Sequence, residues 1–64
     1  AGQLVGVEVK ASATVKDSDL RGLRKLAGLA GAQFKMGVLL YDGDETMPLG
    51  DNIWAAPLAT LWGK

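Results

Sequence analysis

The stretch Leu4–Lys10, Leu-Val-Gly-Val-Glu-Val-Lys, constrains the fold more than any other part of the chain. Its three valines alternate with other residues, at the period of two that is typical of a β-strand, and β-branched side chains favour strands. Glu8 and Lys10 are two residues apart, so both leave the same face of this strand, with Cα atoms roughly 7 Å apart. We expect a strand over about residues 3–11 with one valine face. Because its other face is only partly polar, the pattern is typical of an internal strand.

The segment that follows predicts one amphipathic helix. Apolar residues recur at helical spacing over Leu20–Ala30, and Gly31 is a natural stop. Two capping signals place the start near Asp17. In one, Thr14 pairs with Asp17; in the other, Asp17 is itself the N-cap, with Asp19 in the first turn.

The period of two returns over Gln33–Tyr41, which predicts a second strand, parallel to the first and buried near its end. Phe34, Met36, Val38 and Leu40 are expected on one face of it. Three later elements are predicted. Thr46–Leu49 is a possible strand, which Pro48 limits to a sheet edge. Ile53–Ala56 is a strand that pairs back as a hairpin, and a short helix over Leu58–Trp62 follows, with Pro57 suited to its first position. The expected fold class is α/β, with a small mixed sheet in β-α-β-β-β order and a short C-terminal helix. We expect Trp54 and Trp62 to close the core.

Composition limits the chemistry. The 64 residues make at most one small domain, and they contain no cysteine and no histidine. Any metal would therefore be a hard cation bound through oxygen, such as Mg²⁺ or Mn²⁺. Seven acidic and seven basic residues cancel, so the broad basic surface of a self-sufficient nucleic-acid binder is absent. No apolar run is long enough to span a membrane and no signal peptide opens the chain, so we expect a cytoplasmic protein.

The Glu8-Val9-Lys10 segment is the main candidate for chemistry. An acid and the following backbone carbonyl can hold a divalent cation, while the lysine activates a water or stabilises charge on a phosphate. Glu8 is thus the candidate metal ligand, and Glu8 and Lys10 are the candidate catalytic residues. The alternative is an exposed Glu8–Lys10 ion pair, worth ~0–1 kcal/mol.

Two other charged groups have simpler interpretations. The acidic turn Asp42–Glu45 could bind a cation, but solvated turn chemistry is the better explanation. Arg21, Arg24 and Lys25 could contact nucleic acid or an acidic partner, but they also suit a solvated helix face. No phosphate-binding glycine loop is present.

Several segments, in order, resemble a known family. They are Val7-Glu8-Val9-Lys10-Ala11-Ser12, Asp19-Leu20-Arg21-Gly22-Leu23-Arg24, Gly37-Val38-Leu39-Leu40-Tyr41-Asp42-Gly43, Trp54-Ala55-Ala56-Pro57-Leu58 and Leu61-Trp62. Together they resemble the extreme C-terminus of a prokaryotic ATPase family, in which a domain of unknown function follows an AAA-type nucleotide-binding domain. That domain is similar in turn to the PD-(D/E)XK nuclease fold. The resemblance implies an ATP-binding parent, Glu8 as a metal-binding acid for Mg²⁺, Lys10 as a catalytic lysine, and DNA as substrate.

The match to that nuclease fold is incomplete. Such nucleases take a further acid from a strand that precedes the Glu-x-Lys strand, and here only residues 1–3 precede it. We therefore expect residues 1–64 to be a single partial domain, the C-terminal fragment of a larger ATPase-type protein. Its expected function is that of a non-catalytic module for recognition of a partner or of nucleic acid. The alternative is a divalent-metal-dependent DNA nuclease-like domain, active only with its upstream half. A missing half would leave an apolar surface or a bare strand edge, from which we expect either a homodimer or a loosely packed monomer.

Overall fold

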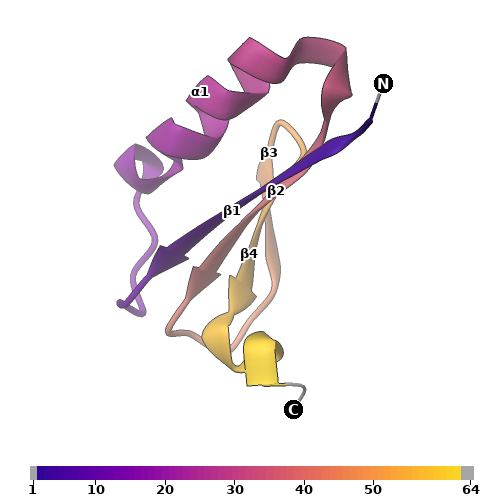
Figure 1. Cartoon of the computed structure of the whole chain (residues 1–64). Coiled ribbons are helices and arrows are strands. Elements are labelled where there is room, and N and C mark those ends of the chain that lie inside the picture. Colours follow the sequence, from indigo (N-terminus) through magenta and orange to yellow (C-terminus); the bar gives the residue numbers. More distant parts are fainter. Residues whose placement is uncertain (1, 63–64) are drawn as a thin grey trace.

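The computed structural model describes residues 2–62, with Trp62 described by its backbone only. Its elements, in chain order, are β1 (Leu4–Lys10), η1 (Asp17–Leu20), α1 (Arg21–Ala30), η2 (Gly31–Gln33), β2 (Phe34–Tyr41), β3 (Met47–Gly50), β4 (Ile53–Pro57) and η3 (Leu58–Trp62), where η marks a short 3₁₀ helix. The predicted mixed α/β fold, with its strand-helix-strand-strand-strand order and short C-terminal helix, is confirmed (Figure 1). Within this part of the chain, no helix is long and apolar enough to cross a membrane.

The four strands form one mixed sheet in the order β1-β2-β4-β3. β2 pairs in parallel with both β1 and β4, and β3 runs antiparallel to β4. The parallel β1–β2 pair and the β3–β4 hairpin are as predicted, and Pro48 lies on an edge strand. The expectation that Leu4–Lys10 is internal is wrong for the described residues, because β1 is the other edge of the sheet.

Helix α1 covers one face of the sheet, over a pair of glycines. Gly6 of β1 and Gly37 of β2 are neighbours in register. A Cβ atom added to Gly6 would lie 2.7 Å from a methyl of Leu26 and 3.0 Å from a methyl of Leu23. A Cβ on Gly37 would lie 3.3 Å from the same Leu23 methyl. The missing side chains thus make the room in which α1 packs. The buried core between the helical segment and the sheet contains Leu20, Leu23, Leu39 and Ile53.

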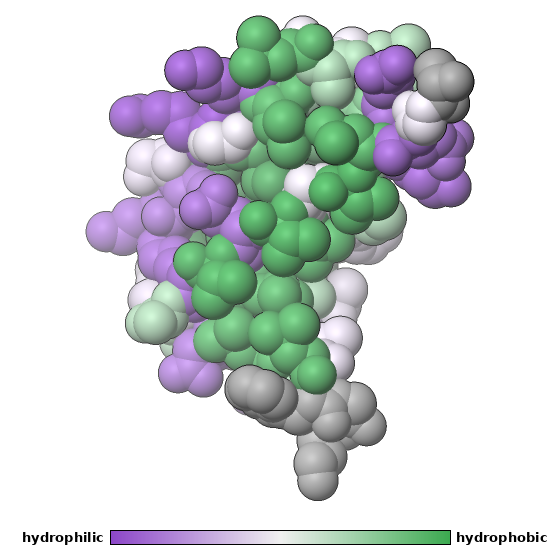
Figure 2. Space-filling model, viewed as in Figure 1, coloured by the Kyte–Doolittle hydropathy of each residue, from purple (hydrophilic) through white to green (hydrophobic). Residues whose placement is uncertain are grey.

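The opposite face of the sheet, away from α1, is apolar, and Leu40 on it is buried. Its side chains follow from the strand registers: Val5 beside Met36, then Val7, Val38 and Trp54 in one row, and Val9, Leu40 and Ala56 in the next. We call these eight residues the valine face. Figure 2 shows a continuous hydrophobic band down the middle of the molecule, toward its C-terminal end. Val5, Val7 and Val9 are 50%, 60% and 58% exposed. Trp54 is 40% exposed, so the prediction that it closes the core is wrong; the side chain of Trp62 lies outside the described residues.

A bulge near the start of β2 corrects the predicted faces of that strand. Leu4 pairs with Phe34 but Val5 pairs with Met36, which leaves Lys35 as an extra residue. A bulge of this kind shifts the alternation of side chains by one. Phe34 consequently points toward α1, where its ring lies 3.1 Å from the position of a Cβ on Gly37, and does not share a face with Met36.

The ends of the helices also differ in detail from the sequence patterns. The helical segment begins at Asp17, as expected, but its N-cap is Lys16, so neither Thr14 nor Asp17 caps it. Helix α1 ends at Ala30, and its C-cap is the predicted stop residue Gly31, which has φ 57°. The short C-terminal helix spans Leu58–Trp62 as predicted, but Pro57 is the last residue of β4 and not the first residue of that helix.

The packing of α1 on the glycine pair gives a first prediction. Gly6→Ala should lower the free energy of unfolding by about 1–3 kcal/mol, because the new methyl overlaps Leu23 and Leu26. Gly28→Ala in the exposed part of α1 is the matched control, since nothing lies within 4 Å of its Cβ position. That variant should gain about 0.5–1 kcal/mol from helix propensity. Urea unfolding followed by circular dichroism measures both, and equal effects of the two substitutions would contradict this packing.

Candidate functional site

The candidate residues Glu8 and Lys10 line one pocket. It has a volume of about 300 Å³ and lies between the C-terminal end of β1 and the start of the helical segment. Its lining comprises Glu8, Val9, Lys10, Ser18, Asp19, Gly22 and Leu39. Positions 8 and 10 share the face of β1 that carries Gly6, which is the face that α1 covers. The predicted common orientation of the two side chains is therefore present.

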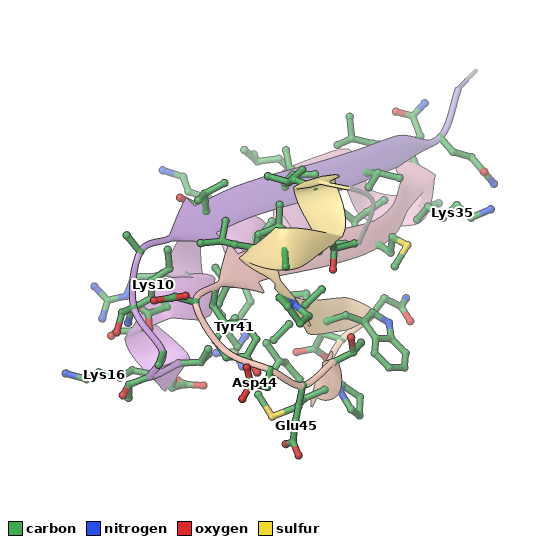
Figure 3. The ribbon with its side chains drawn as sticks, turned by 90° about the horizontal axis from the view of Figure 1, so that it is seen from below. Lys10, Lys16, Lys35, Tyr41, Asp44 and Glu45 are labelled. Carbon is green, nitrogen blue, oxygen red and sulfur yellow. The ribbon has the colours of Figure 1, made fainter. Side chains whose placement is uncertain are left out.

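Lys10 pairs with Asp19 and not with Glu8. The Lys10 ammonium donates a hydrogen bond to Oδ2 of Asp19, and both side chains are 22% exposed. Lys10 extends from β1 toward the start of the helical segment (Figure 3). The backbone N–H of Lys16 donates to the same carboxylate oxygen at 2.7 Å. The Glu8–Lys10 ion pair that we considered as the simple alternative is replaced by this Lys10–Asp19 clasp.

The clasp changes the acidity of Asp19. The hydrogen bond from Lys10, followed by that from the Lys16 N–H, holds the pKa of the Asp19 carboxyl below its ordinary value, although partial burial acts in the opposite direction. Sequence reasoning assigned Asp19 only to the first turn of the helix. The sequence feature that could have placed Asp19 close to Lys10 is the short connection of residues 11–16. This connection must return the chain from the end of β1 to the start of the helix beside it.

Glu8 is exposed, and its carboxylate lies over the first turn of α1. A Cβ on Gly22 would lie 3.1 Å from Oε1 of Glu8, so the glycine leaves room for this side chain. Residues 2–62 contain no ion pair of Glu8 and no group of three or more acidic side chains that could hold a metal ion. The pocket offers a cation two carboxylates, of which Asp19 is already bonded to Lys10.

The acidic turn Asp42–Glu45 and Arg24 of α1 make contacts within the fold. In the acidic turn, the Tyr41 hydroxyl donates to the backbone carbonyl of Glu45 at 2.6 Å, and the three carboxylates are exposed. Figure 3 shows Asp44 and Glu45 in the loop beside Tyr41. On α1, Arg24 pairs with Asp17 at 3.0 Å and contacts Asp51 at 3.9 Å. These contacts support a structural role for Arg24 and for the backbone of the acidic turn.

Comparison with known proteins gives one result. The sequence model of a family described as "Domain of unknown function (DUF4143)" matches residues 1–61. The chain belongs to the DUF4143 family. This confirms the expected domain of unknown function. Among curated proteins and among solved structures, nothing matches the DUF4143 chain. The AAA-type parent and the PD-(D/E)XK likeness stay predictions.

The clasp predicts a pH-dependent contribution to stability. Because folding lowers the pKa of Asp19, its bond to Lys10 stabilises the fold above the ordinary carboxyl pKa of about 3.9 and is lost as pH falls through the lowered value. Asp19→Asn should therefore destabilise the domain at neutral pH, and the difference from the unmodified chain should shrink in acid. Urea midpoints at several pH values measure this. Asp44→Asn, in the exposed turn, is the control, and a difference that does not change with pH would contradict the clasp.

Proposed function

We propose that this DUF4143 domain is a non-catalytic interaction module that binds another polypeptide through its valine face. The observation that carries the proposal is the uncovered apolar surface. Three of the four strands are parallel to one another, and parallel sheets are normally covered on both faces. Here α1 covers one face, while on the other the three β1 valines are half or more exposed and Trp54 is 40% exposed, with Leu40 buried beside them. A patch without any charged side chain, spread over three strands, is typical of an interaction site.

The apolar character favours a polypeptide over nucleic acid as the partner. The eight residues of the valine face include no cation that could contact a phosphate. On the helix, Arg24 is bonded to Asp17. In the ATP-binding parent that the sequence resemblance implies, such a module would hold a protein partner beside an AAA-type domain, and ATP would bind only in that other domain.

A second candidate function rests on the pocket. It gathers Glu8, Lys10 and Asp19, the kinds of side chain that a divalent-metal-dependent DNA nuclease uses. In that function Glu8 would bind Mg²⁺ and Lys10 would act on a water or a phosphate. We rank it second because Asp19 already binds Lys10, which leaves Glu8 as the single uncommitted carboxylate of the pocket. Magnesium sites that serve phosphoryl transfer need additional oxygen ligands.

A magnesium titration separates the two functions. We expect the backbone amide signals of Glu8, Lys10 and Asp19 in NMR spectra to stay unchanged through millimolar Mg²⁺. Saturable shifts confined to these residues, and absent in Glu8→Gln, would favour the nuclease-like function and contradict the proposed one. Glu45→Gln in the exposed turn is the control for non-specific attraction of the cation.

Photo-crosslinking tests the docking surface itself. A benzophenone amino acid at position 7 of the full-length protein, in cells, should crosslink to a polypeptide that mass spectrometry identifies by its peptides. The same amino acid at position 29 is the control, because Leu29 is 79% exposed on α1, on the other side of the sheet. Crosslinking at position 7 that does not exceed that at position 29 would contradict a docking role for the valine face.

A further inference from the structure

We draw no further inference here: the strongest candidate, the apolar face of the sheet that β1, β2 and β4 form away from α1, carries none because nothing in the structure of residues 2–62 shows what covers it.

Discussion

The contact of Leu23 and Leu26 with the Gly6–Gly37 pair decides how this small domain is organised. Two glycines in register on neighbouring strands leave a flat area on one face of the sheet, and methyl groups from the helix occupy it. A Cβ atom at position 6 would overlap the Leu26 methyl at 2.7 Å and crowd the Leu23 methyl at 3.0 Å, so these side chains would have to shift. Packing of the helix on this face turns the valines to the other face. The alternating valines of β1 thus lie on the surface, and the two glycines lie under the helix.

This outcome shows what periodicity can and cannot predict. The alternation in residues 4–10 predicted a strand, Gly31 predicted the helix end, and Pro48 predicted an edge strand, because each depends on local backbone geometry. Which face the helix covers depends on contacts between distant residues, and period two carries no information on that choice. Trp54 was misplaced for this reason. Phe34 was misplaced because a single bulge residue, Lys35, shifts the alternation at the start of β2.

The candidate site was also predictable from the sequence only in part. The common face of Glu8 and Lys10 followed from their spacing alone. Asp19 comes from another element, and it reaches Lys10 only because the connection of residues 11–16 turns the chain back. Its carboxylate accepts hydrogen bonds from the Lys10 ammonium and from the Lys16 backbone, so it joins the end of β1 to the start of the helical segment. This partnership gives the lysine a structural role that its place in a Glu-x-Lys pattern did not indicate.

The two proposed functions consequently use opposite faces of one strand. Even-numbered positions of β1 point toward the helix and carry Gly6, Glu8 and Lys10, while the valines at odd-numbered positions point away from it. Substitutions in the pocket therefore leave the docking surface intact, and substitutions at the valines leave the Lys10–Asp19 clasp intact. The Lys10–Asp19 clasp joins the end of β1 to the helical segment, while the pairing of β1 with β2 places Val7 and Val9 beside Val38 and Leu40. A surface built from side chains on three strands can present one flat patch only while its edge strand stays paired along its whole length.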